Sequence, residues 1–150
     1  MIPTLFGRWQ TRIFLLATIG LLFTLPFALG VIGFTQGRFT PAYFWVLFYV
    51  GLFGLAWDVL YDYLQKYLWD HDWPGVLEFF GAIAEGILLI FMIKVVGLPH
   101  IPQSLHLDAF ILHYSVVSVV AYLASWVVMR LLFPRWRFRG GQWIGKWPRK

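Results

Sequence analysis

The stretch that decides the fold is residues 57–85, WDVLYDYLQKYLWDHDWPGVLEFFGAIAE, which joins the end of one apolar run to the middle of another. It holds six of the seven acidic residues of the chain. Two of these, Asp58 and Glu85, fall in segments otherwise apolar enough for hydrocarbon. An ionisable side chain there is costly and marks a site by default. The stretch therefore predicts a hairpin of two membrane helices with acidic side chains at their contact.

The composition of the chain favours a membrane protein. Of its 150 residues, 60% are hydrophobic and 13% are charged, and the mean hydropathy is +0.71. Soluble domains carry about 25% charged residues. The chain has no cysteine, which excludes disulfides, thiolate metal sites and cysteine catalysis. Its basic residues flank the apolar runs, so the high pI does not indicate a nucleic-acid partner.

Four apolar runs, each about long enough to cross a bilayer, follow one another along the chain. We therefore predict an all-α integral membrane protein: a four-transmembrane-helix bundle forming a single domain over residues 1–134. The first run resembles a secretory signal, but it is longer than the roughly 7–15 residues of such an apolar region. We expect a retained span, kinked at Pro26. The predicted spans are residues 13–34, 42–64, 76–96 and 108–133.

The distribution of basic residues predicts the orientation of these spans. Four spans place both termini on one side, and that side holds ten of the 12 Lys and Arg residues, leaving Arg38 and Lys94 on the other. Because cytoplasmic segments are enriched in Lys and Arg, we predict that both termini are cytoplasmic (N-in/C-in). The expected location is the plasma (cytoplasmic, or inner) membrane of the cell, as a multi-pass protein.

Small and polar residues recur at steps of three and four along the last three spans, so each span has one polar face. Small residues let membrane helices approach closely, and polar ones seek partners across the contact. We expect the three faces to point inward together. They comprise Gly51, Gly54, Asp58, Asp62 and Gln65 on the second span, Glu78, Gly81, Ala82 and Glu85 on the third, and Ser115, Ser118, Tyr122 and Ser125 on the fourth.

The acids of this stripe are the candidate buried polar or proton-handling residues: Asp58, Asp62, Glu78 and Glu85. Folding the hairpin around residue 70 offsets Asp58 and Glu85 by about one helical turn on facing stripes. Two carboxyl groups this close in a low dielectric do not both ionise, so we predict that Glu85 is protonated. The other two acids keep their charge if Arg12 or Arg130 reaches them. One interpretation is structural, a lock on helix register; the other is a proton or cation pathway.

The histidines do not complete a metal or haem site in this pattern. His113 lies nearly opposite the serine stripe of the fourth span, so we expect its polar tip to point at lipid headgroups. The loop Asp70-His71-Asp72 favours a solvated, capping turn over a metal site. We expect no cofactor. The chain has no Gly-rich phosphate loop, no H-E-x-x-H and no G-x-S-x-G motif, and therefore we do not expect an enzyme.

Residues 135–150 form a tail in which cations alternate with aromatic residues. Each Lys or Arg near an anionic leaflet contributes about 1 kcal/mol, and Trp sits well at headgroup level. We predict that this cytoplasmic tail binds anionic lipids; a docking peptide for a partner protein is the alternative. The predicted membrane-surface residues are Arg135, Trp136, Arg137, Arg139, Lys146 and Trp147.

These features favour a non-enzymatic membrane protein that acts by association, as an accessory subunit or scaffold of a membrane complex. Its partner would be another membrane protein or a second copy of the chain. The alternative is a small oligomeric proton-coupled transporter or channel that uses a buried Glu85/Asp58 pair. A membrane-embedded enzyme using the acids with a metal is a third, more distant hypothesis.

Overall fold

The structure, a computed structural model, describes residues 4–32, 37–68 and 75–132, and these residues are helical apart from short links. Four of the helical stretches are long and apolar enough to cross a membrane, which confirms the all-α prediction with four spans. The first span comprises α1 (Leu5–Leu15), the π-helical segment η1 (Leu16–Gly20) and α2 (Leu21–Ala28). The second is α3 (Ala42–Gln65), the third is α4 (Gly75–Phe91) with the π-helical segment η2 (Met92–Val96), and the fourth is α5 (Leu107–Leu132).

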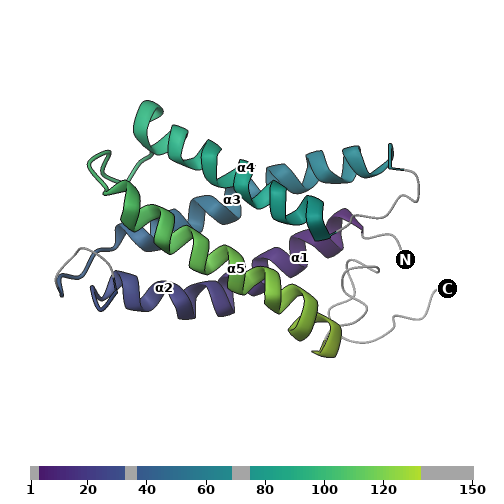
Figure 1. Cartoon of the computed structure of the whole chain (residues 1–150), viewed down its shortest axis with the longest axis horizontal. Helices are drawn as coiled ribbons and strands as arrows, with labels where there is room; N and C mark the ends of the chain where they lie inside the picture. Colours follow the sequence, from purple (N-terminus) through teal and green to yellow (C-terminus); the bar gives the residue numbers. More distant parts are fainter. Residues whose placement is uncertain (1–3, 33–36, 69–74, 133–150) are drawn as a thin grey trace.

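Successive spans run in opposite directions (Figure 1). We call the half of the bundle where α1 begins and α5 ends the terminal half, and the half where α2 ends and α5 begins the loop half. Helices α1 and α2 pack on α3, and η1 packs on α5. Helix α4 contacts α3 and, less extensively, α5. The first, second and fourth spans therefore form the more tightly packed part of the bundle.

The first span begins earlier and ends earlier than the predicted 13–34. It starts at Leu5, where the N-cap Thr4 accepts a hydrogen bond from the Gly7 amide at 3.2 Å. The residues before Ile13 continue the helix because they are amphipathic, with Gly7 and Gln10 buried against the bundle. A search for continuous apolar runs misses such residues because polar and apolar side chains are mixed in them, although they can form an amphipathic helix.

The first span ends at Ala28 in a Schellman motif. The amide of Val31 donates to the Pro26 carbonyl at 2.9 Å, and the amide of Gly30 donates to the Phe27 carbonyl at 3.1 Å. Gly30 has a φ of +72°, a conformation that favours glycine. Val31 and Ile32 therefore lie outside the helix.

The bend of the first span lies before Pro26, the residue at which a kink was expected. Pro26 lies inside α2, while the first span changes direction at the junction of α1 and α2 (Figure 1), where η1 lies. A π-helical turn inserts an extra residue into the hydrogen-bond ladder and is a common cause of bending. The bend visible in the fold therefore coincides with Leu16–Gly20, before the proline.

Apolar packing differs between the two halves. The larger core cluster lies in the loop half and comprises Phe27, Tyr43, Val46, Leu89, Ile93, Ile101, Leu105, Ala109 and Phe110. The smaller comprises Leu15, Ala124 and Met129 in the terminal half. The outward faces of all four spans carry large exposed hydrophobic residues, as expected for helices whose solvent is lipid. The terminal half, where the apolar cluster is small, contains the polar residues of the candidate site.

Candidate functional site

Arg12 of α1 lies between two carboxylates of other helices. Its Nε and Nη2 atoms donate to the two oxygens of Asp58 on α3, each at 2.9 Å. Its Nη1 and Nη2 atoms donate to the two oxygens of Glu85 on α4, at 3.0 and 3.2 Å. The side chains are 22%, 6% and 10% exposed in the order Arg12, Asp58, Glu85. One guanidinium thus makes bidentate, charge-assisted contacts that join three helices.

This arrangement differs from the direct Asp58–Glu85 contact expected from the sequence, in which Glu85 was protonated. The early start of α1 brings Arg12 two turns into the membrane helix, level with both acids. Because the guanidinium supplies donors to both carboxyl groups, their proximity does not require a proton on Glu85. The sequence suggested that Arg12 reaches Asp62 and Glu78, whereas in the structure it pairs with Asp58 and Glu85. The side chain of Arg130, the other arginine considered for these acids, lies outside the described part of the chain.

Two residues of α3, Tyr61 and Gly54, contact Glu85 and the arginine respectively. Tyr61 of α3 donates its hydroxyl to Glu85 Oε1 at 3.0 Å. Gly54 leaves space for the arginine: a Cβ there would lie 2.7 Å from the guanidinium carbon of Arg12. We call Arg12, Asp58, Glu85 and Tyr61 the Arg12 network.

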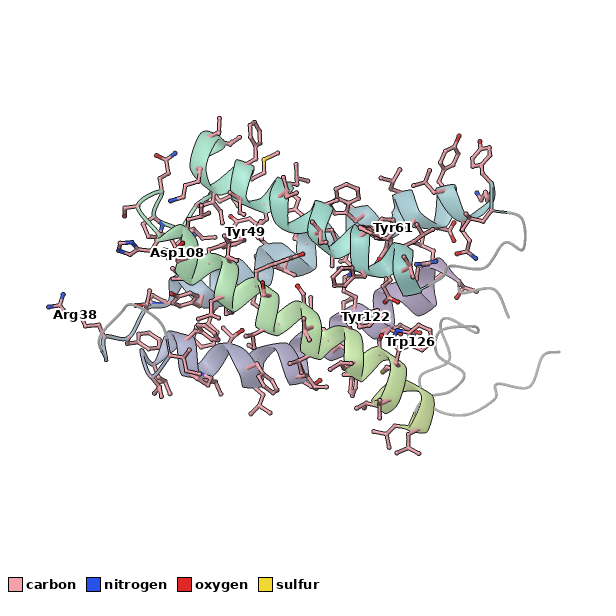
Figure 2. The ribbon with its side chains drawn as sticks, in the orientation of Figure 1. Arg38, Tyr49, Tyr61, Asp108, Tyr122 and Trp126 are labelled. Atoms are coloured by element: carbon pink, nitrogen blue, oxygen red, sulfur yellow. The ribbon has the colours of Figure 1, made fainter. Side chains whose placement is uncertain are left out.

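A cavity of about 150 Å³ adjoins the Arg12 network in the terminal half. A cavity of this volume has room for several water molecules. Its charged walls carry two guanidinium groups and three carboxyl groups, so their formal charge sums to −1 when all are ionised. Figure 2 shows Tyr61 and Tyr122 in this half, on α3 and α5. The polar lining residues are Arg8, Thr11, Arg12, Asp58, Tyr61, Glu78, Glu85, Tyr114, Ser118, Tyr122 and Ser125.

The predicted polar stripes meet at this cavity only in part. Glu78 lines it together with Asp58 and Glu85, whereas Asp62 is half-buried outside the lining. Ser115, predicted to face inward, is exposed on α5. The reason is geometric: Ser118, Tyr122 and Ser125 follow steps of four and three along one face, and Ser115 falls at the edge of that face, where no neighbouring helix covers it.

Tyr114 closes the cavity on the side of the loop half. Its hydroxyl donates to the Ala82 carbonyl of α4 at 2.6 Å. A Cβ at Gly86 would lie 2.6 Å from the ring of Tyr114, so this glycine makes room for the ring. Leu16, Val50 and Val117 also line the cavity; we call these three residues the apolar floor.

The prediction that His113 points at lipid headgroups is wrong. This residue is 1% exposed, its Nε2 shares a hydrogen bond with Thr24 Oγ1 at 3.0 Å, and its ring lies 5.1 Å from those of Phe27 and Tyr43. The helical wheel did place it away from the serine stripe. However, η1 and α2 cover that second face of α5, so both faces are internal. We call Thr24, Phe27, Tyr43 and His113 the His113 cluster.

Two residues that line the cavity, Tyr61 and Tyr114, were not predicted to belong to the site, and Arg12 was predicted to pair with other acids. A signal for Arg12 exists: Arg8, Thr11, Arg12 and Leu15 follow helical spacing and line one cavity wall. The predicted tail residues Arg135, Trp136, Arg137, Arg139, Lys146 and Trp147 lie outside the described residues, as does the loop Asp70-His71-Asp72.

The chemistry available to this site is that of carboxyl, guanidinium and hydroxyl groups. Within residues 4–32, 37–68 and 75–132, no group of three or more His, Asp or Glu side chains is placed to hold a metal ion. The features of the site that bear on function are its ion pairs and its cavity. Comparison with known proteins finds no match to a family model, to a curated protein or to a solved structure.

Proposed function

We propose that this chain is a non-enzymatic, multi-pass protein of the plasma (cytoplasmic) membrane that acts by association, as an accessory subunit or scaffold of a membrane complex. The observation that carries this proposal is the Arg12 network. One arginine provides hydrogen bonds to both deeply placed acids, Asp58 and Glu85. A pair of acids held in this way has a structural role that needs no transported ion.

The network explains how the outer surface of the bundle is held in one shape. Helix α4 packs on α3 and, with fewer contacts, on α5, and Glu85 ties α4 to α1 and α3 through the arginine. Buried ion pairs add little net stability, and their best-attested use is to specify one arrangement of helices. A fixed α4 presents a constant apolar face, including Phe80 and Ile87, to a partner in the bilayer. That partner is another membrane protein or a second copy of the chain.

Photo-crosslinking in the native membrane tests this association. A photo-reactive residue is placed at Phe80 or Ile87 on α4 and, as the matched control, at Leu123 on α5; all three positions are exposed. We expect a discrete crosslinked protein, or a dimer of the chain, from the α4 positions, and lipid adducts alone from the α5 position. Lipid adducts alone from every position would contradict the proposal.

The orientation belongs to the same proposal, with both termini on the cytoplasmic side and the basic tail against anionic lipids. The ten basic residues on the side of the termini support it. Single cysteines at Gly37 or Gln103 should react with an impermeant thiol reagent added to intact cells, whereas cysteines at Gln142 or at the exposed Tyr67 should not. The reverse pattern would place the Arg12 network in the outer half of the membrane.

A second candidate function, proton-coupled transport, is favoured by the cavity. Glu78 and Glu85 line it seven residues apart on α4, so water in the cavity would connect Glu85 with the terminal end of the bundle. In proteoliposomes, Glu85→Gln should abolish pH-driven flux while the protein stays folded, because an amide cannot release a proton. Flux that is equal in the wild type and in Glu85→Gln would exclude this use of Glu85.

A further inference from the structure

Two polar atoms of the His113 cluster are buried without a partner. They are Tyr43 Oη and His113 Nδ1, and neither has a hydrogen-bond partner among the residues that the structure describes. Tyr43 is 0% exposed and His113 is 1% exposed. Leaving such a group unsatisfied carries its full desolvation penalty, and buried polar groups in proteins generally find a partner in the protein or in ordered water.

The two atoms belong to neighbouring rings from different helices. The phenol ring of Tyr43 on α3 and the imidazole of His113 on α5 have centroids 5.1 Å apart, at an interplanar angle of 55°. Thr24 of α2 holds the other imidazole nitrogen at 3.0 Å, and Phe27 packs with its ring at 75° to the imidazole. The Thr24 bond therefore holds the imidazole in one orientation, with its Nδ1 buried.

We infer that Tyr43 and His113 bind an internal water molecule in the loop half of the bundle. Water suits the site because it both donates and accepts, so it satisfies the phenol and either tautomer of the imidazole. The other cluster members are Thr24 and Phe27, which carry no charge, so the cluster suits a neutral ligand. A metal ion needs more ligating side chains than one histidine and one phenol.

The position of this water relates it to the cavity. His113 lies one helical turn before Val117 on the same face of α5, and Thr24 and Tyr43 lie two turns from Leu16 and Val50 on their own helices. The apolar floor thus lies between the internal water and the cavity of the terminal half. The site is distinct from the Arg12 network and does not depend on the function proposed for it.

A double-mutant cycle tests the inference. Tyr43→Phe removes only the hydroxyl and keeps the ring, and the second variant is His113→Leu. If the water bridges the two residues, Tyr43→Phe should raise the unfolding equilibrium constant of the detergent-solubilised protein roughly fivefold to tenfold. In the His113→Leu background, the same change should have almost no effect, because the water has already lost one of its partners.

Tyr63→Phe is the matched control, because Tyr63 is an exposed tyrosine of the same helix; we expect it to change the constant less than twofold. A Tyr43→Phe variant that is as stable as the wild type, or more stable, would overturn the inference, because deleting an unpartnered hydroxyl relieves its burial. An equal effect of Tyr43→Phe in both backgrounds would also overturn it. Should His113→Leu not fold, a high-resolution experimental map of the wild type decides: ordered density within hydrogen-bonding distance of both atoms supports the water, and a dry site refutes it.

Discussion

In the terminal half of the bundle two buried carboxyl groups pair with an arginine beside a cavity, whereas in the loop half a buried histidine pairs with a neutral threonine within the larger apolar core. The Arg12 network joins an arginine and two acids next to space for several water molecules. The His113 cluster joins a threonine, a tyrosine and a histidine to Phe27. Charges in a membrane protein need a counter-charge and some hydration, while hydroxyl and imidazole groups need only hydrogen bonds. The same four helices therefore provide two different environments at their two ends.

The strongest test of this difference is to remove the cation. Arg12→Met leaves Asp58 and Glu85 facing each other without a counter-charge, and should destabilise the protein by about 3–5 kcal/mol. The measurement is SDS-driven unfolding in mixed micelles at neutral pH. Arg8→Met is the matched control on the same helix, since Arg8 donates a hydrogen bond to the neutral Gln65 at 2.6 Å.

The triple variant Arg12→Met, Asp58→Asn, Glu85→Gln should recover most of that loss, because no charge then remains unpaired. If Arg12→Met were no more harmful than Arg8→Met, the network would not be the main polar contact of the terminal half.

A smaller effect is expected from crowding the network without changing its charges. A Cβ at Gly54 would overlap the guanidinium of Arg12, whereas a Cβ at Gly51 would meet a methyl carbon of Leu16 at 3.5 Å, an ordinary contact. Gly54→Ala should therefore cost about 1–3 kcal/mol. Gly51→Ala should be neutral or stabilising by up to about 1 kcal/mol, because alanine favours the helix. Equal effects of the two substitutions on unfolding would contradict the position assigned to Arg12.

The loop half should respond to the loss of a neutral hydrogen bond. Thr24→Val keeps the shape of the side chain but leaves His113 Nε2 unpaired, and should cost about 1–2 kcal/mol. Thr18→Val is the control, because Thr18 is exposed and bonds only within its own helix, to the Phe14 carbonyl. Thermal unfolding of the two variants in detergent measures the difference. If Thr24→Val loses no more stability than Thr18→Val, the His113–Thr24 hydrogen bond does not stabilise the loop half.

The four spans could be predicted because each run of apolar residues is long enough for a bilayer, and such a run has few other stable structures. The observed α3, Ala42–Gln65, and α5, Leu107–Leu132, lie close to the predicted 42–64 and 108–133. The acids Asp58 and Glu85 could be singled out because charge is rare in such runs. The hairpin placed them on facing helices, and both bind Arg12.

The partner of these acids could not be predicted from hydropathy. Whether Arg12 lies at the membrane edge or two turns into a helix depends on where that helix begins, and Thr4 marks the beginning as the N-cap that accepts from the Gly7 amide. For His113, the helical wheel gives the face of α5 but not the helix that covers it. Both residues show that a pattern within one span predicts its faces, while the pairing of faces depends on tertiary packing.

The smallest expected effect comes from the edge of the Arg12 network. Tyr61→Phe removes the hydrogen bond from the phenol to Glu85 Oε1 but leaves the bidentate contact of Glu85 with Arg12. Because the carboxylate keeps its counter-charge, the variant should lose only about 0.5–1.5 kcal/mol. The loss should fall to about half in a Glu85→Gln background if the phenol stabilises the ionised carboxylate, since the amide oxygen still accepts but hydrogen bonds to a charged acceptor are about twice as strong as neutral ones. The four unfolding constants of this cycle give the coupling directly. An equal loss in both backgrounds would mean that Tyr61 contributes through the packing of its ring against α4, where Gly81 makes room for it.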